Sequence, residues 1–375
     1  MKVVHLPCYD INPYQRLLIQ ALNRVDVDAV DGGGGGNFLR SILFRWRADV
    51  VHFHWLHPYL LRPTRLGTII RAIRFLFELL ILRAAGVRLV WTVHNLHNHE
   101  GKYLGIERFM TSCAAKLFHA IVCHSNYSAQ QAADRFGIKC SKINVIPHPV
   151  FNELYSNTVS TNHARKILGL DLNDAVILFI GRVAPYKGIE KLIDTFLTIN
   201  APGSQLVIAG MPMSQEYQKK IETEVEGNSK IHLVLRRIED DEMQVFLNAA
   251  DVVAFPFRNI LTSGSLLLAM GFGKACIAPR IGSIPETFPD LQLPLTYLPE
   301  DEQGLELAIR EAFTQKDSLA GIGQENLKIC SEWTWEMMAK QCLQTYGFGN
   351  AAVDNASSQS RVPLSDTSSE TKITL

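Results

Sequence analysis

One stretch of this chain, residues 176–189 with the sequence VILFIGRVAPYKGI, restricts the fold more than any other. Residues 176–180 are all apolar, which is typical of a strand buried on both faces of a parallel sheet. Gly181 then permits a turn, Arg182 and Lys187 follow it, and residues 189–196 show the pattern of an amphipathic helix. Open α/β sheets bind anionic ligands in loops of this kind. The alternative is an ordinary loop whose Arg and Lys face solvent.

The same alternation of strands and helices runs through both halves of the chain. It predicts an α/β protein with two parallel, doubly wound sheets that face each other across a cleft. The predicted strands are residues 3–6, 25–30, 49–53, 87–93, 120–123 and 144–146, then 176–180, 205–209, 231–235, 251–254 and 275–278.

The chain has 375 residues, enough for two domains with full cores. Pro149 and the polar run SNTVSTN indicate a junction between them. We expect a first domain over residues 1–148, a linker with a short helix over 149–172, a second domain over 173–334 and a last helix over 335–348. Residues 349–375 are rich in Ser and Thr and lack core-forming residues, so we expect them to be disordered.

Charge and cysteine content narrow the functional class. Lys plus Arg and Asp plus Glu number 37 each, so no overall positive field favours nucleic acid. The seven cysteines are scattered without a Cys-x-x-Cys pair, which indicates reduced thiols. No signal peptide is visible, because residues 1–7 already read as a first strand. We therefore expect a cytoplasmic protein.

Residues 68–85, TIIRAIRFLFELLILRAA, are the most apolar stretch. Arg71, Arg74 and Glu78 share one narrow helical face, and nearly every other position is apolar. The charges argue against a bilayer span. Two interpretations stay open: a helix packed between the sheet and its neighbours, or a surface that contacts a membrane, to which residues 38–46 (FLRSILFRW) would add.

Histidines follow two strands that should lie near the centre of the first sheet. His52, His54 and His57 occur in VHFHWLHP, and His94, His97 and His99 occur in TVHNLHNHE. A zinc site is not favoured, because no carboxylate or cysteine joins at ligand spacing and nothing fixes a third ligand. Hydrogen bonding or proton transfer in the cleft fits better, and His94 is the first candidate because it directly follows a strand.

A second turn with ligand-binding character lies in FPFRNILTSGSLLLAMGFGKACIAP, residues 255–279. Thr262, Ser263, Gly264 and Ser265 separate a predicted strand from a helix, and hydroxyls with backbone N–H groups at a helix start can bind an anion. The alternative is a plain N-cap. Because this turn and the Gly181 turn follow strands of one sheet, together they would suit a diphosphate.

At these residues the sequence resembles GT-B glycosyltransferases, most closely family 4. The similar segments are GRVAPYKGIEKLI (181–193), IAG (208–210), FPFRNILTSGSLLLAMGFGKACIAPRIGSIPE (255–286), IPHPV (146–150) and the last helix, so the resemblance covers roughly residues 1–348. It implies that the first domain binds the acceptor and that the second binds a nucleotide sugar.

The resemblance also implies site residues. Arg182 and Lys187 would hold the diphosphate and act in catalysis, and His94 loosely matches the family's active-site histidine. The full implied donor-binding set is Gly181, Arg182, Lys187, Thr262, Ser263, Gly264, Ser265 and Glu286, and the acceptor-binding set is Asn12, Tyr14, His54, His57 and Asn95.

The sequence departs from the family at one point. Family members usually carry two glutamates separated by seven residues, and Ile260 and Leu268 occupy those positions here. The TSG turn without glutamates resembles a subgroup of bacterial polysaccharide enzymes and the chitobiosyl-lipid β-mannosyltransferases. Whether the anomeric centre is retained or inverted stays open.

We therefore expect a hexosyltransferase that moves a sugar from a nucleoside diphosphate to a hydroxyl acceptor in polysaccharide or glycolipid assembly. We expect no cofactor and no metal, since the Asp26–Asp28 pair fits an Asp-x-Asp pattern only inside a predicted strand. Expected partners are the nucleotide sugar, a sugar or lipid-linked sugar acceptor and the inner membrane face, but not nucleic acid. One alternative is a non-catalytic sugar-nucleotide-binding partner subunit. Another is a sugar-phosphate epimerase, but that reaction would need more acidic and basic catalytic residues than this sequence offers.

Overall fold

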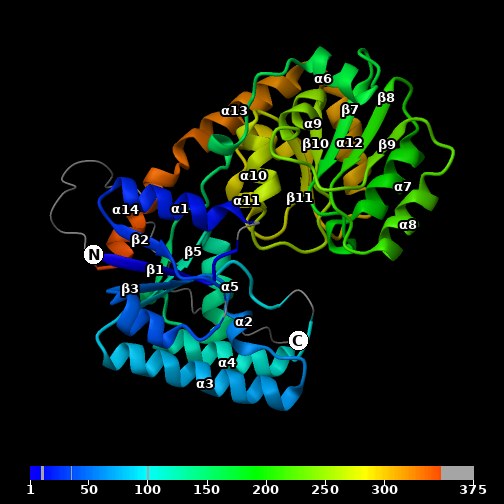
Figure 1. Cartoon of the computed structure of the whole chain (residues 1–375). Helices are drawn as coiled ribbons and strands as arrows, with labels where there is room; N and C mark the ends of the chain where they lie inside the picture. The colour runs from blue at the N-terminus through cyan, green and yellow to red at the C-terminus, as the bar shows by residue number, and fades with distance from the viewer. Residues whose placement is uncertain (10–11, 35, 99–100, 348–375) are drawn as a thin grey trace, which may run out of the picture.

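The structure is a computed structural model, and it describes residues 1–9, 12–34, 36–98 and 101–347 (Figure 1). Within these ranges the chain forms two lobes, each built on a six-stranded parallel sheet with helices on both faces. The prediction of two doubly wound α/β domains is confirmed, while their boundaries by residue number stay predictions. The tail predicted at residues 349–375 and His99 lie outside the described residues.

The first lobe contains the sheet β2-β1-β3-β4-β5-β6. Its strands are β1 (Lys2–Leu6), β2 (Asp28–Asp31), β3 (Val50–Phe53), β4 (Arg88–Thr92), β5 (Ala120–Cys123) and β6 (Ile143–Val145). Its helices and helical turns are α1 (Pro13–Arg24), η1 (Ser41–Trp46), α2 (His57–Leu60), α3 (Arg65–Ala84), α4 (Leu104–Leu117), α5 (Asn126–Phe136) and η2 (Cys140–Lys142). The strand order reverses between β1 and β3, and the carboxyl ends of strands at such a reversal form a ligand-binding crevice.

The second lobe contains the sheet β12-β11-β10-β7-β8-β9, whose order reverses between β7 and β10. Its strands are β7 (Ala175–Ile180), β8 (Ser204–Ala209), β9 (Ile231–Val234), β10 (Val252–Ala254), β11 (Ala275–Pro279) and β12 (Thr296–Tyr297). Its helices and helical turns are η3 (Asn152–Leu154), α6 (Thr161–Leu168), η4 (Pro185–Lys187), α7 (Ile189–Ile199), α8 (Gln215–Glu224), α9 (Met243–Ala249), α10 (Gly264–Gly271), α11 (Ile284–Thr287), η5 (Asp290–Leu295), α12 (Gly304–Thr314), η6 (Lys316–Ser318) and α13 (Leu319–Glu332).

The strands read as continuous apolar runs because both faces of each sheet are covered. Val3 and Val50 pack with Leu18 of α1 on one face, while Val4 and Val51 pack with α3 and α4 on the other. Neighbouring residues of a strand point to opposite faces, so the central strands β3, β5, β10 and β11 are buried at every position.

The last helix, α14 (Trp335–Thr345), returns to the first lobe and lies beside α1 (Figure 1). The Trp335 indole N–H donates to the Val150 carbonyl at 2.8 Å, and Arg88 donates to the Thr345 carbonyl. The Tyr346 hydroxyl lies 2.7 Å from Nδ1 of His52. These contacts hold the connection between the lobes, including the segment around residue 148, against the first sheet.

Two details of the predicted strands are wrong. β2 begins at Asp28 instead of residue 25, because α1 continues to Arg24 and Asp26 makes a turn with a φ of 61°. Asp28 then pairs with Lys2 at 2.9 Å, so the two aspartates do not share one strand. β12 was not predicted, because two residues carry too little pattern to be recognised as a strand.

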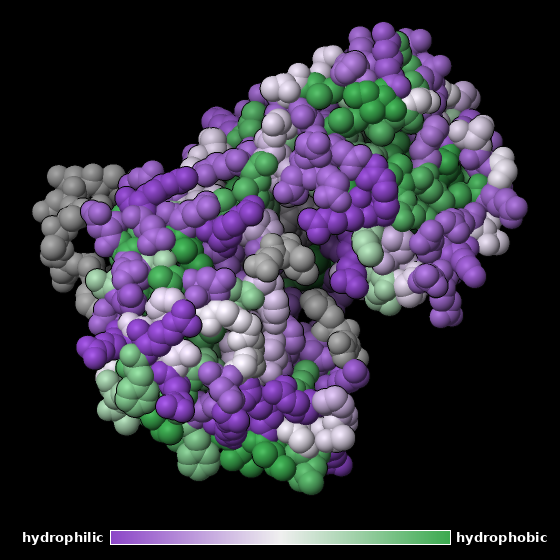
Figure 2. All heavy atoms as spheres, in the orientation of Figure 1, coloured by the Kyte–Doolittle hydropathy of each residue, from purple (hydrophilic) through white to green (hydrophobic). Residues whose placement is uncertain are grey.

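The helix predicted at residues 68–85 is α3, and it packs on one side only. Phe75, Leu79 and Leu82 are fully buried, and Arg71 and Glu78 also face inward. The exposed large hydrophobic residues of α3 are Leu66, Ile70, Ile73, Phe77, Leu80 and Ile81. Figure 2 shows hydrophobic residues gathered at the lower edge of this lobe, where α3 lies.

The packed-helix interpretation therefore holds for one face of α3 and fails for the other. Of the hydrophobic residues in the adjoining segment, Phe38 and Ile42 are buried and only Phe44 is largely exposed, so the segment adds less apolar surface than expected. In the part of the chain that the structure describes, no helix has both the length and the apolar character needed to cross a membrane.

Candidate active site

The turn after β7 is held close to the second lobe's other site loop by two glycines. Gly181 has a φ of 132°, and a Cβ placed on it would lie 2.9 Å from Oγ of Ser265. Gly188 has a φ of 75°, and a Cβ there would lie 1.9 Å from the Pro256 carbonyl oxygen. Any larger residue would push the loops apart, so these glycines bring the β7 and β10 switch-point loops into contact.

Between these glycines, Arg182 is exposed and Lys187 is 9% exposed. The Lys187 ammonium lies 4.3 Å from the centre of the Phe257 ring. Among the described residues no carboxylate forms an ion pair with it, and burial lowers its pKa to about 8. A buried cation is costly unless an anion lies beside it, which indicates that a ligand supplies the negative charge.

The turn after β10 leads directly into α10. Oγ of Ser263 accepts a hydrogen bond from the Leu266 N–H at 3.2 Å, so Ser263 is the N-cap of this helix. Its O–H can still donate, so the hydroxyls of Thr262, Ser263 and Ser265 and the first N–H groups of α10 are all available to an anion. Those N–H groups have no acceptor within the helix, and the positive end of the helix dipole adds to them.

Three adjoining cavities lie between the lobes. The His148 cavity, about 300 Å³, is lined by Asn12, Pro13, Tyr14, His94, His148, Phe151, Tyr155, Met243, Gly264, Ser265 and Leu268. The Glu286 cavity shares His148 with it and adds His124, Ser125, Thr262, Ser263 and Glu286, among others. The Tyr186 cavity, about 370 Å³, includes Asn95, His97, Tyr127, Gln131, Arg135, Asn259, Ile260 and Thr262. The volumes of the His148 and Tyr186 cavities are in the range of ligand sites.

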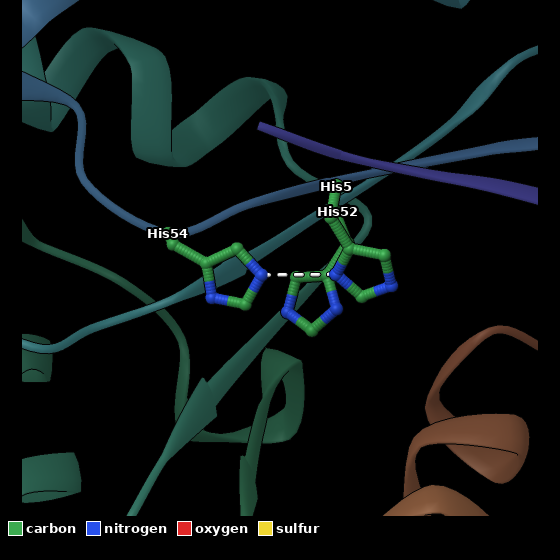
Figure 3. Close-up of side chains that lie close together, drawn as sticks. All are labelled: His5, His52 and His54. Carbon is green, nitrogen blue, oxygen red and sulfur yellow. Dashed lines mark hydrogen bonds between the residues drawn. The ribbon is translucent and has the colours of Figure 1, made fainter. Parts of the chain in front are cut away.

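The first lobe holds a cluster of histidines behind this cleft, and of the four described first only His94 lines one of the three cavities. His5 and His54 are hydrogen-bonded between Nδ1 and Nε2 at 3.0 Å (Figure 3), and Nδ1 of His54 lies 3.2 Å from Nε2 of His94. His52 lies beside them, with its nitrogens 2.7 Å from the hydroxyls of Tyr346 and Thr92. Every one of these rings comes from the carboxyl end of a central strand or the residues after it.

The nitrogens of His5, His52 and His54 lie within 4.8 Å of one another, which is close enough for them to share a metal ion if their lone pairs converge. The His52 and His54 rings are stacked, with centroids 4.5 Å apart and planes at 23°. Ring lone pairs lie in the ring planes, so stacked rings do not aim them at one point. Both His52 nitrogens are also hydrogen-bonded. This geometry favours a hydrogen-bonded network over a metal site.

Two further histidines complete the cluster. Nδ1–H of His124 donates to the Ile146 carbonyl at 2.9 Å, and Nδ1–H of His148 donates to the Pro149 carbonyl at 2.6 Å. A carbonyl oxygen can only accept, so both rings carry their proton on Nδ1 and leave Nε2 bare. The Tyr14 hydroxyl donates to the bare Nε2 of His124 at 3.2 Å.

Burial keeps the whole cluster uncharged at neutral pH. It lowers the pKa of His5 and His148 to about 3 and that of His124 to about 4. Burial, together with the neighbouring histidines, also lowers the pKa values of His52, His54 and His94 well below the ordinary value. The first lobe therefore offers neutral donors and acceptors, and the second lobe offers positive charge.

Comparison with known proteins matches a separate family model to each lobe. Residues 34–153 match the family described as "Glycosyltransferase Family 4", and residues 174–315 match "Glycosyl transferases group 1". The chain belongs to the family 4-like glycosyltransferases with the GT-B fold.

Individual relatives of this GT-B chain are distant. A GDP-mannose:glycolipid 4-beta-D-mannosyltransferase of Xanthomonas campestris is 25% identical over 62% of this chain and 62% of that protein, so the match spans less than two thirds of its length. Sucrose-phosphate synthase from Thermosynechococcus elongatus has the same fold, with a TM-score of 0.75 and 16% identity. The match covers 92% of this chain and 98% of the synthase. HepE of Anabaena, in complex with UDP and glucose, also has this fold, with a TM-score of 0.71 and 16% identity. The match covers 92% of this chain and 99% of HepE.

The structure brings together some of the predicted site residues of this GT-B chain. Asn12, Tyr14 and His94 of the first lobe line one cavity with Gly264 and Ser265 of the second. Asn12 also caps α1, since its Oδ1 accepts from the Tyr14 N–H at 3.0 Å. Tyr14 is only 2% exposed, so it supports the cavity wall more than it offers surface to an acceptor.

Other predicted acceptor residues lie elsewhere. His54 is 1% exposed between His5 and His94, so a direct contact with an acceptor would require rearrangement. His57 begins α2 and lines a separate, smaller cavity. Asn95 lines both that small cavity and the Tyr186 cavity, so it alone of these three faces the cleft.

Glu286 differs most from its predicted role as a donor contact. Its carboxylate accepts hydrogen bonds from the N–H groups of Asn126 at 2.7 Å and Tyr127 at 2.5 Å, at the start of α5. The residue thus connects the second lobe to a helix N-terminus of the first, where a negative charge is favourable. Each carboxylate oxygen keeps a further lone pair, so a donor contact would add to these two bonds.

Sequence reasoning missed His5, His124 and His148. The signal was available, because His124 follows β5 directly and His5 lies near the end of β1. The carboxyl ends of all parallel strands share one edge of the sheet, but the prediction used only the strands at residues 49–53 and 87–93. Applied to β1, β5 and β6 as well, it would have placed all three histidines at the cleft.

Proposed function

We propose that this protein transfers a hexosyl group from a nucleoside-diphosphate sugar to a hydroxyl of a sugar or lipid-linked sugar acceptor. The observation that carries the proposal is the buried Lys187, which has no carboxylate partner among the described residues and lies where the β7 and β10 loops meet. A diphosphate would supply the missing negative charge. The names of the relatives, a GDP-mannose:glycolipid mannosyltransferase and a HepE complex with UDP and glucose, support this class of donor.

In this proposal the second lobe stabilises the leaving group. Arg182, Lys187 and the N-terminus of α10 would surround the diphosphate as negative charge develops on it. Two cations and a helix start can perform this role without a metal ion. His94 would contact the donor sugar or the acceptor from the opposite wall, since it lines the same cavity as Gly264 and Ser265.

The direct test is release of nucleoside diphosphate from a panel of donors. We expect the full chain to release it from one of GDP-mannose, UDP-glucose or UDP-N-acetylglucosamine, with octyl glycosides as hydroxyl acceptors and with EDTA present. Transfer that stops with EDTA and returns with Mn²⁺ or Mg²⁺ would contradict metal independence. Binding of a nucleoside diphosphate without any turnover would instead favour the non-catalytic partner subunit.

We further propose that the protein meets its acceptor at the cytoplasmic face of a membrane through α3 and α4. The exposed hydrophobic residues of α3 continue on α4 with Leu104 and Phe109. Both carboxylates of these helices, Glu78 and Glu107, are buried. The exposed charged residues of the two helices are therefore all cations: Arg65, Arg74, Arg83, Arg108 and Lys116. Apolar side chains among cations suit an anionic lipid surface.

We expect the double variant Ile70→Glu/Phe77→Glu to stop flotation with vesicles of phosphatidylglycerol and phosphatidylcholine, because it places two negative charges in this surface. Both positions are more than half exposed, so the melting temperature should stay unchanged. Leu307→Glu on α12 is the matched control, with 57% exposure on the other lobe. Wild-type protein that stays entirely at the bottom of the gradient would show that the acceptor is met in solution.

A further inference from the structure

We infer that His148 is the general base that accepts the proton of the acceptor hydroxyl. The inference rests on the proposed function and names a residue of that same site. His148 comes from the segment after β6 that connects the lobes, and it lines both the His148 cavity and the Glu286 cavity. It therefore lies between the start of α10, where we place the leaving diphosphate, and the first lobe.

The hydrogen bonding of His148 prepares it for this role. Nδ1–H donates to the Pro149 carbonyl at 2.6 Å, so Nε2 keeps its lone pair. The backbone is held as well, because Val150 donates to the Trp333 carbonyl at 3.1 Å and accepts from Trp335. A base must direct its lone pair at the reacting proton. The bond from the His148 ring to Pro149 and the two bonds of the Val150 backbone restrict where that lone pair can point.

Other acid–base groups of the cleft are engaged. Both carboxylate oxygens of Glu286 accept backbone N–H groups of α5. Nε2 of His124 accepts from the Tyr14 hydroxyl. Ile260 and Leu268 occupy the positions of the family's two glutamates, so neither position provides a carboxylate that could act as a base. Glu286 does not line the His148 cavity, so the remaining candidates among the described histidines of the cavities are His94, His97 and His148.

The His5–His54–His94 chain makes His94 a hydrogen-bond donor instead of a base. At its far end, Nε2 of His5 is buried without a partner in the described chain. A buried N–H group without an acceptor is rarer than a bare acceptor, so the proton of His5 is on Nδ1 and points to His54. His54 then donates from Nδ1 to Nε2 of His94. His94 therefore carries its proton on Nδ1. His97 is exposed, and no hydrogen bond between described residues fixes which of its nitrogens is protonated.

The inference takes the inverting course, in which the step balances as a single displacement. The acceptor oxygen forms a bond to the anomeric carbon while the bond from that carbon to the phosphate oxygen breaks, and the nucleoside diphosphate leaves with the electron pair. The hydroxyl proton passes to Nε2 of His148, which later returns it to solvent. Burial and His124 lower the pKa of His148 to about 3, which is in the range of the carboxylates that act as bases in glycosyl chemistry. A bound diphosphate would raise this pKa and strengthen the base.

His148→Asn tests the base by kinetics. The asparagine amide can still donate to the Pro149 carbonyl, while the Nε2 lone pair is lost and a space remains. We expect kcat for nucleoside diphosphate release to fall roughly 100-fold or more, with donor KM little changed, and added imidazole to restore part of the rate. His163→Gln on the surface of α6 should match the wild type, since this histidine is exposed and outside the cleft.

The outcomes separate this inference from the proposed function. Absence of release from the wild type counts against the function. Release by the wild type with an unchanged kcat in His148→Asn, or with the large loss in His97→Gln instead, overturns the role of His148. An independent readout is ¹⁵N NMR of the histidine-labelled full chain, in which we expect His148 neutral with its proton on Nδ1 at pH 7. A proton on Nε2 there would overturn the inference without reference to activity.

Discussion

Replacing Lys187 with methionine is expected to lower kcat/KM for the donor roughly 10- to 100-fold and to leave the ligand-free protein at least as stable as the wild type. The loss follows from the charge-assisted contacts to the diphosphate, each about 1.5–3 kcal/mol. Arg182→Ala should cost a similar factor, and the double variant more. Because the Arg182 side chain is exposed, its removal should not disturb folding.

The stability expectation comes from the pKa of Lys187, which burial lowers from 10.5 to about 8. Between those two pH values the folded protein binds fewer protons than the unfolded chain. The charged side chain therefore costs the folded state about 3 kcal/mol below pH 8, and this cost is relieved as pH rises toward 10.5. Methionine removes the cost, so the variant should melt no lower than the wild type while losing the thermal shift caused by a nucleoside diphosphate.

The same pKa predicts the pH dependence of donor use. Free wild-type protein loses the Lys187 charge as pH rises through about 8, so kcat/KM should decline there, and Lys187→Met should lack this decline. Lys219→Met, at an exposed lysine of α8, is the matched control for removal of one positive charge. A double variant Arg182→Ala/Lys187→Met with wild-type kcat/KM would show that the diphosphate binds elsewhere.

Leu268→Glu is expected to destabilise the second lobe by about 3 kcal/mol or more, because it buries a carboxylate with no partner. Leu268 is 6% exposed on α10 and belongs to the core beneath the β7 and β10 loops. For a lobe of this size the change corresponds to a fall of roughly 6–12 °C in its melting temperature. Leu268→Met should cost less than about 1.5 kcal/mol, since it nearly conserves volume.

The control for the added charge is Leu307→Glu, at a leucine that is 57% exposed in the same lobe. Leu268 also lines the His148 cavity with Tyr155 and Met243, so one outcome would reverse our view of this position. If Leu268→Glu folds like the wild type and transfers sugar faster, the side chain faces the donor as the family's glutamate does. The position would then be a lost ligand contact and not a core residue.

Local patterns were sufficient to predict the sheets and the loops of the second lobe. Residues 176–180 form β7 because five consecutive apolar residues can be buried only where both faces of a strand are covered. Gly181, Gly188 and the Thr262–Ser265 turn follow their strands directly in sequence. Parallel strands place such loops at one edge, so their meeting could be predicted without coordinates.

The charged positions of α3 show where the pattern was insufficient. Arg71, Arg74 and Glu78 lie on one face of the helix, and a charged face is expected to be exposed. Instead Arg71 and Glu78 are buried, Arg74 bonds to Glu78 at 2.9 Å, and the wider apolar face is exposed. Periodicity identifies the two faces of a helix, but only the neighbouring elements decide which of them is covered.

The sequence by itself determined the two parallel sheets, the paired loops after β7 and β10 and the loss of the family's glutamates, because each depends on residues adjacent along the chain. Tertiary structure alone decided what the remaining polar groups do. Glu286 binds the start of α5 from the other lobe, His54 is enclosed between His5 and His94, and His148 keeps a bare nitrogen because its ring is bonded to Pro149. A side chain's hydrogen-bond partners determine its proton and its availability, and those partners come from distant parts of the chain or from a local geometry that residue identity does not reveal.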